Sequence, residues 1–251
     1  MKDTKLMMGM PITVEIVSSL SPVVVKKTLD RSFEYFGYVD NKFSVYKEDS
    51  EISKINRGAI SVDKASADMQ EIFHLAEMTK NETDGYFDII NRNGIFDPSG
   101  IVKGWAIYNV AKLIKTDGFE NFFVEAGGDI QVNGFNQNGE RWRVGIENPF
   151  DQGKFVKKVT LTNQGIATSG TYIRGQHIYN PKQKDLEIRD IVSLSVIGSN
   201  IFEADRFATS VFAMGQEGII FLEKQKNLEG YIITSDGKAV MTSGFEKYVI
   251  T

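Results

Sequence analysis

Apolar and polar residues alternate along several short stretches of this chain, as they do in strands with one buried face. The clearest N-terminal example is Ile-Thr-Val-Glu-Ile-Val at residues 12–17. Between residue 121 and about residue 196 strand signals dominate, and glycine and asparagine turns separate them. The strands expected in this region cover residues 122–124, 130–132, 142–146, 156–161 and 192–196.

Other segments space their apolar residues as an α-helix does. Ser21-Pro22 supplies an N-cap and a first-turn proline, so a helix is expected from residue 22 to about residue 38. Further helices are expected at 66–80, 100–118, 202–214 and 216–226, the last followed by short strands. Helices and strands are segregated rather than strictly alternating, which favours an α+β fold over a doubly wound parallel sheet.

The composition is that of a globular protein with a sizeable core, since 41% of its 251 residues are hydrophobic and 11% aromatic. This length suits one large domain or two small, closely packed ones. Because no repeat, low-complexity tract or linker interrupts the chain, residues 1–251 are interpreted as a single domain. A net charge of −4 gives no basic footprint for nucleic acid, and no run of eighteen apolar residues is present to span a membrane.

The chain contains no cysteine, which excludes disulfides, thiolate zinc sites and cysteine nucleophiles within it. Its first residues lack the apolar segment of a secretory signal, so the sequence as given is expected in the cytoplasm. A periplasmic protein whose leader had been trimmed would look the same.

A carboxylate and a hydroxyl lie four residues apart in the segment 203–209. In a helix Asp205 and Thr209 share one face, and both are oxygen ligands of the kind that Mg²⁺ accepts. The same two residues also fit an ordinary polar pair on a helix surface. The pair alone therefore leaves both interpretations open.

The segment 97–104, Asp-Pro-Ser-Gly-Ile-Val-Lys-Gly, leads into the third expected helix. Its small residues let a ligand approach the backbone, and helix N-termini attract phosphate. Lys103 adds a positive charge for a phosphate oxygen. A plain helix capped by Ser99 explains the segment as well, and the spacing does not match a Walker A loop.

Three further segments fit a phosphate-cleaving site without defining one. Gly127-Gly128 lies between two strands as a tight turn or bulge, and no helix follows it, so a dinucleotide fingerprint is rejected. Residues 168–170 are expected to form a turn. His177 is one of two histidines and lies in an expected loop; His74 falls off the apolar stripe of its helix and is expected at the surface. With no second histidine at ligand spacing, a zinc site is not expected.

These segments occur in the order typical of the ApbE family, the flavin:protein FMN transferases that use FAD and require Mg²⁺. The chain resembles that family over nearly its whole length, from residue 8 to about residue 245. The resemblance implies an ApbE-like, T-fold-related α+β architecture of mixed antiparallel sheets with segregated helices and two closely packed subdomains. The matching segments are 8–10, 43–53, 83–89, 97–104, 127–129, 168–170, 177–181 and 204–209.

The resemblance also implies a role for individual residues. His177 matches the proposed catalytic histidine of the family. The Mg²⁺ ligands that it implies are the backbone carbonyl of Gly100 and the side chains of Asp205 and Thr209. FAD contacts are implied for Met8 and Tyr46 on the adenine side, and for Tyr86, Phe87, Asp88, Asp97, Lys103 and Val192 along the flavin groove.

The implied reaction cleaves FAD at its pyrophosphate, attaches FMN through a phosphoester bond to a threonine or serine of a target protein, and releases AMP. Two alternatives stay open: a hydrolase that releases FMN and AMP, and a protein that binds FAD without turnover. Tyr46 favours transfer, because members with a smaller polar residue there look more like hydrolases. The chain departs from the family pattern at Met10 and Asn180, where threonine and aspartate are usual.

Overall fold

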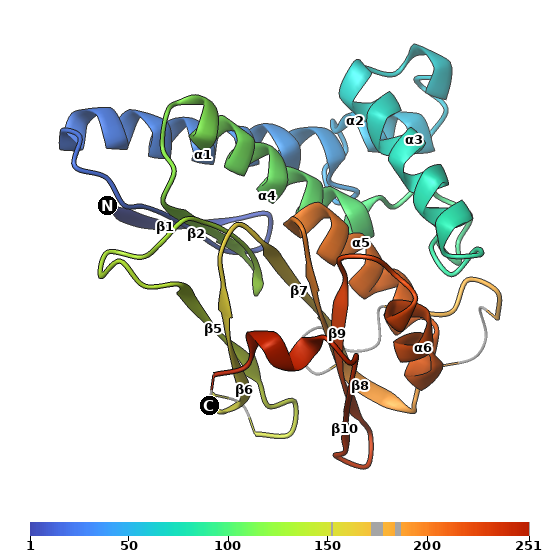
Figure 1. Cartoon of the computed structure of the whole chain (residues 1–251). Helices are drawn as coiled ribbons and strands as arrows, with labels where there is room; N and C mark the ends of the chain where they lie inside the picture. Colours follow the sequence, from blue (N-terminus) through green and yellow to red (C-terminus); the bar gives the residue numbers. More distant parts are fainter. Residues whose placement is uncertain (152, 172–177, 184–186, 251) are drawn as a thin grey trace.

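The computed structural model of the chain describes residues 1–151, 153–171, 178–183 and 187–250. Within these residues an eight-stranded antiparallel sheet has the order β1-β2-β3-β4-β7-β8-β9-β10, and β5 pairs with β6 in a separate hairpin (Figure 1). The strands are β1 (Lys2–Met7), β2 (Met10–Ile16), β3 (Phe122–Ala126), β4 (Asp129–Asn133), β5 (Trp142–Glu147), β6 (Phe155–Leu161), β7 (Gly165–Gly170), β8 (Ile191–Gly198), β9 (Glu229–Thr234) and β10 (Ala239–Met241).

The helices lie on one side of the large sheet, and the β5–β6 hairpin lies on the other (Figure 1). None of the helices in the described part of the chain is long and apolar enough to span a membrane. The helices are α1 (Pro22–Phe43), α2 (Glu51–Asn56), α3 (Ala67–Glu82), α4 (Ser99–Thr116), α5 (Ile201–Phe212) and α6 (Gly218–Glu223), with short 3₁₀ turns at Val62–Lys64, Gly215–Glu217 and Phe245–Tyr248.

Both faces of the central strands are buried, because side chains alternate between two separate apolar clusters. In β8, Val196 packs into the cluster under the helices, and its neighbour Ile197 packs into the cluster against β5, β6 and the C-terminal turn. Ile232 and Ile233 of β9 divide in the same way. The fold therefore has three layers, with the large sheet in the middle.

Helix α1 shows how the sequence produces this arrangement. Ser21 is its N-cap and Pro22 its first residue, as predicted. The helix runs to Phe43 instead of ending near residue 38, because Val39 and Phe43 continue its buried stripe. The predicted α+β class, the segregation of helices from strands and the five central strand predictions are confirmed.

The prediction of a turn at residues 168–170 is wrong, because these residues end strand β7 between β4 and β8. Apart from the buried Ile166, strand β7 consists of glycine, alanine, threonine and serine, which together give a weak strand signal, so its place between two strands fixes its conformation. Gly165, at its start, lies against the backbone of Ile201 at the beginning of α5. Ser99 is likewise not a cap: α4 begins at Ser99, and Pro98 is the N-cap without a side-chain hydrogen bond.

The glycine pair at residues 127 and 128 forms a two-residue turn between β3 and β4, where Ala126 pairs with Asp129. Both glycines have positive φ, 59° and 93°, as the tight turns of two-residue hairpins require. The tight-turn interpretation is therefore confirmed, and it fixes the position of Asp129 as the first residue of β4.

We expect Gly165→Ala to lower the free energy of unfolding by at least about 2 kcal/mol, because the added Cβ would overlap backbone atoms of Ile201. Urea unfolding followed by far-UV circular dichroism measures the change. Gly37→Ala is the matched control, since its Cβ would meet only the end of the Met7 side chain at 3.4 Å within helix α1. Equal stability of Gly165→Ala and wild type would contradict the close packing of β7 on α5.

Candidate functional site

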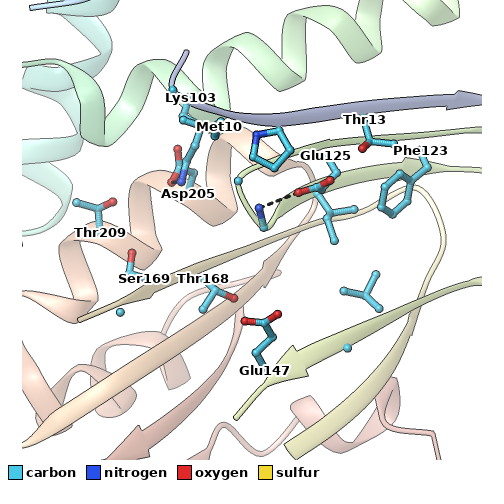
Figure 2. A pocket seen from close by; sticks show the side chains of 18 of the residues that line it. Met10, Thr13, Lys103, Phe123, Glu125, Glu147, Thr168, Ser169, Asp205 and Thr209 are labelled. Carbon is cyan, nitrogen blue, oxygen red and sulfur yellow. Dashed lines mark hydrogen bonds and ion pairs between the residues drawn. The ribbon is translucent and has the colours of Figure 1, made fainter. Parts of the chain in front are cut away.

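A cavity of about 810 Å³ lies where the helices, the large sheet and the β5–β6 hairpin meet. It is lined from the β1–β2 turn, the start of α4, the β3–β4 hairpin, β5, β6, β7 and α5 (Figure 2). Figure 2 shows Asp205 and Lys103 next to each other on the helix side and Glu147 on the strand side. The cavity therefore combines charged groups from segments far apart in the sequence.

A second, smaller cavity of about 100 Å³ adjoins the first. Four residues, Ser99, Gly100, Ile178 and Thr209, line both. The first turn of α4 and the middle of α5 thus form the boundary between the two spaces. The smaller cavity is further lined by predicted FAD contacts, namely Tyr86, Phe87, Asp88 and Asp97.

Helices α4 and α5 pack closely at this boundary and bring together three groups whose oxygen atoms could bind a metal ion. The Thr209 hydroxyl lies 3.5 Å from the carbonyl oxygen of Gly100. One turn earlier in α5, the Asp205 carboxylate accepts a hydrogen bond from the Gly104 N–H at 2.7 Å. A side chain at Gly104 would not fit, because its Cβ would lie 2.6 Å from the Asp205 Cβ.

Asp205 is only 3% exposed, so the interpretation of Asp205 and Thr209 as a surface pair is wrong. Burial raises the pKa of Asp205 to about 7. The Lys103 ammonium and the Gly104 N–H oppose this rise in pKa, and the Asp129 carboxylate adds to it. With Lys103 beside it, the Asp205 carboxyl is therefore near the midpoint of its titration at neutral pH, and a bound cation would favour its ionised form.

The donor set fits a small hard cation such as Mg²⁺. A carboxylate, a hydroxyl and a backbone carbonyl are all oxygen ligands, and three protein ligands leave coordination positions for phosphate and water. No group of three or more histidine, cysteine, aspartate or glutamate side chains in the described residues could hold a metal ion. A cation bound here would therefore rely on the neutral oxygens of Gly100 and Thr209 as well as on Asp205.

Lys103 projects from α4 into the same space, between two carboxylates. Its ammonium lies 2.5 Å from Asp129 Oδ2 and 3.7 Å from Asp205 Oδ1. Asp129 is fully buried, and its other oxygen accepts the N–H of Thr168 at 3.0 Å. The sequence marked the Gly-Gly-Asp segment but assigned no role to Asp129, because a turn carboxylate looks the same whether it is solvated or buried.

The remaining predicted residues divide into three groups. Asp88 is held by the Lys80 ammonium at 2.8 Å, and Asp97 accepts the Ser99 N–H at 3.1 Å. Three predicted contacts line neither of the two cavities: Met8 packs on the main core, Tyr46 is 94% exposed, and Val192 packs on the second core. His177 lies outside the described residues.

The larger cavity also contains charged residues that the sequence did not indicate. Glu125 accepts the N–H of Gly128 at 3.0 Å, and Arg143 and Glu147 border the cavity from β5. In the sequence, Arg143 and Glu147 look like ordinary solvent-exposed polar positions of a strand. Only the packing of the β5–β6 hairpin against the sheet reveals that they face a cavity. The Phe155 ring lies against Gly145 beside them.

The fold and the site define an α+β protein in which the oxygen atoms of Gly100, Asp205 and Thr209 lie at the junction of two cavities. The sequence model of the ApbE family matches residues 8–93 and 90–232 of this chain. The chain belongs to the ApbE family.

Curated relatives are named FAD:protein FMN transferase. The protein from Vibrio cholerae serotype O1 is 32% identical over 165 residues, which are 61% of this chain and 49% of the relative. The protein from Escherichia coli K12 is 29% identical over 167 residues, 62% of this chain and 48% of the relative. The chain thus spans about half the length of the curated relatives it matches.

Solved structures share the fold over almost their whole length. The flavin transferase ApbE from Vibrio cholerae superposes with a TM-score of 0.83 at 24% identity, covering 99% of this chain and 98% of that one. The apo form of the Pseudomonas stutzeri flavinyl transferase ApbE gives 0.85 at 19% identity, covering 100% and 97%. These matches confirm the predicted ApbE-like fold.

We expect Asp205→Asn to remove a pH dependence of stability in metal-free buffer. Between the unfolded pKa of 3.8 and the folded pKa of about 7, the folded wild type keeps a proton that the unfolded chain has released. Its free energy of unfolding therefore falls as pH rises through this range, by at most about 1.4 kcal/mol for each pH unit. The variant has no such proton, and its amide oxygen still accepts the Gly104 N–H.

Urea unfolding of both proteins at several pH values, with EDTA present, measures this difference. Titrating groups that do not interact with Asp205 contribute equally to both proteins, so the difference between the two curves reports Asp205 together with its neighbours Lys103 and Asp129. Parallel curves across the whole range would contradict the buried, proton-retaining carboxylate.

Proposed function

We propose that this chain is a Mg²⁺-dependent enzyme that cleaves FAD and transfers FMN to a threonine or serine hydroxyl of a target protein, with release of AMP. The observation that carries the proposal is the oxygen donor set of Gly100, Asp205 and Thr209 at the junction of the two cavities. A dinucleotide is long and has its two phosphates in the middle. Two cavities that meet at the proposed cation ligands suit such a molecule, because the phosphates can lie at the junction and one nucleotide can extend into each cavity.

The proposal assigns the Mg²⁺ ion to the Asp205 carboxylate, the Thr209 hydroxyl and the Gly100 carbonyl. When bound, the ion would offset the negative charge that accumulates on the phosphates during cleavage. Lys103 adds a positive charge from the same side of the cavity, since its ammonium lies 3.7 Å from Asp205. The names of the curated relatives, FAD:protein FMN transferase, support this reaction for the family.

In this proposal the flavin nucleotide contacts the smaller cavity, which Tyr86, Phe87, Asp88 and Asp97 line. Its volume of about 100 Å³ is below the roughly 300 Å³ of typical ligand pockets, so side chains must move on binding. Lys182 lies beside this cavity, since its ammonium is 4.4 Å from the centre of the Tyr86 ring and pairs with the exposed Asp84. Met8, Tyr46 and Val192 remain predicted contacts that require the bound ligand to reach beyond the two cavities.

The acceptor hydroxyl attacks the FMN-side phosphorus of FAD, and the bond from that phosphorus to the bridging oxygen breaks. AMP leaves with the bridging oxygen. The hydroxyl proton passes to a base, because a neutral hydroxyl is a weak nucleophile. The resemblance to the family assigns the base to His177, which lies outside the described residues.

We expect a mass gain of one FMN on an acceptor flavoprotein domain incubated with the chain, FAD and Mg²⁺, and release of AMP in equal amount. Intact-mass spectrometry of the acceptor and chromatography of the nucleotides measure the two products. EDTA should abolish both. An acceptor with its threonine or serine replaced by alanine is the matched control and should gain no mass.

Other outcomes select the alternatives. FMN and AMP in solution, with an unlabelled acceptor, would identify a hydrolase and overturn the transfer step. Tight FAD binding without AMP, equal with and without Mg²⁺, would identify a binding protein and overturn the enzymatic proposal.

His177→Ala and Asp205→Ala should each reduce FMN transfer to background while the chain stays folded, as far-UV circular dichroism would report. His74→Ala is the control for loss of a histidine, since His74 is exposed on α3, as predicted. Wild-type transfer rates in either site variant would contradict the assigned roles.

A further inference from the structure

The Lys103 ammonium lies between two buried carboxylates that belong to different parts of the fold. Asp129 Oδ2 at the start of β4 is 2.5 Å away, and Asp205 Oδ1 on α5 is 3.7 Å away. The lysine side chain is 19% exposed, and the two aspartate side chains are 1% and 5% exposed. One positive charge thus faces two negative groups in a site with little solvent screening.

The position of Asp129 is fixed by the backbone around it. The two-residue turn of Gly127 and Gly128 precedes it, and Ala126 pairs with it across the hairpin. Its Oδ1 accepts the N–H of Thr168, which ties the side chain to the neighbouring strand β7. Its Oδ2 lies 2.5 Å from the Lys103 ammonium as an ion pair, and its carboxyl group also interacts directly with that of Asp205.

These distances determine which of the two carboxylates forms the closer ion pair with the Lys103 ammonium. An ammonium in direct contact with Asp205 would occupy the space beside the carboxylate oxygen that a cation needs, and it would repel that cation. The attraction between unit charges rises as their distance falls, so the closer Asp129 holds the ammonium more strongly. Lys103 remains close enough to the cavity to face a phosphate.

We propose that Asp129 is a positioning residue that holds the Lys103 ammonium away from Asp205 and so leaves the Asp205 carboxylate available to Mg²⁺. The inference rests on the proposed Mg²⁺ site. It adds a residue from the β3–β4 hairpin that acts on the proposed Mg²⁺ site through Lys103. Without Asp129 the lysine becomes a competitor of the metal ion.

The test is a Mg²⁺ titration of thermal stability with four proteins: wild type, Asp129→Asn, Lys103→Met and the double variant. A Mg²⁺ ion that binds the folded chain but not the unfolded chain raises Tm. The size of the rise depends on the Mg²⁺ concentration relative to Kd. In Asp129→Asn the amide oxygen of the new side chain can still accept the Thr168 N–H, whereas its NH₂ group cannot hold an ammonium. We expect this substitution to raise the Kd for Mg²⁺ by about 10- to 100-fold, as loss of an outer partner of a metal ligand does.

The double variant separates positioning from a general effect of charge. If Lys103 competes once it is released, Lys103→Met should recover most of the lost affinity in the Asp129→Asn background but improve nothing in the wild-type background. A general charge effect predicts that Lys103→Met strengthens Mg²⁺ binding by the same factor in both backgrounds. Additive effects of the two substitutions would therefore overturn the inference.

Lys103→Arg gives a second test that keeps every charge and leaves Asp129 in place. The longer, forked guanidinium can reach both carboxylates at once, so we expect weaker Mg²⁺ binding than in wild type. An unchanged Kd in this variant would overturn the inference even if Asp129→Asn did not fold.

Asp117→Asn is the matched control for loss of an ion-paired aspartate away from the cavity, since Asp117 pairs with Arg31 at 2.6 Å. It should lower Tm without changing the Kd for Mg²⁺. If wild type itself shows no Mg²⁺-dependent rise in Tm, the proposed metal site fails, and the inference fails with it. If wild type responds and Asp129→Asn responds with the same Kd, the inference alone fails.

Discussion

The close approach of α4 and α5 at Gly104 is the contact on which the site depends. Because Gly104 has no side chain, the Asp205 carboxylate can lie directly against its backbone N–H, 2.7 Å away. The same approach brings the Gly100 carbonyl within 3.5 Å of the Thr209 hydroxyl, one turn along each helix. A larger residue at position 104 would separate the helices and move the Gly100 carbonyl of α4 away from Asp205 and Thr209 of α5.

The large sheet supplies the rest of the site because both of its faces are covered. Helices pack on one face and the β5–β6 hairpin on the other, and the cavity forms where these layers meet at the β3–β4 turn and β7. Asp129 and Thr168 bring the sheet's own polar groups to this place and join them through a hydrogen bond. The buried charges of the helix layer are thus balanced from the sheet layer.

The sequence predicts those parts of the fold that carry a strong local pattern. The stripe of Val25, Leu29 and Phe33 defines α1, and the four-residue spacing of Asp205 and Thr209 places both on one helix face. Strand β7 could not be predicted, because it consists mostly of small residues that owe their conformation to neighbouring strands and to α5. The ion pair between Lys103 and Asp129 could not be predicted from the sequence either. The rest of α4 and all of β3 lie between the two residues, so only the folded chain brings their side chains together.

The donors Gly100 and Thr209 also lie far apart in the order in which a ribosome makes the chain. Strands β3 to β8 are synthesised between them, and the α4–α5 contact cannot form until α5 is complete. A nascent chain that stops before residue 209 therefore has not assembled the proposed cation site, however much of its sheet has formed. At the proposed site, affinity for the ion would be a property that the polypeptide acquires late in synthesis, and metal binding would favour the finished fold over its partly made precursors.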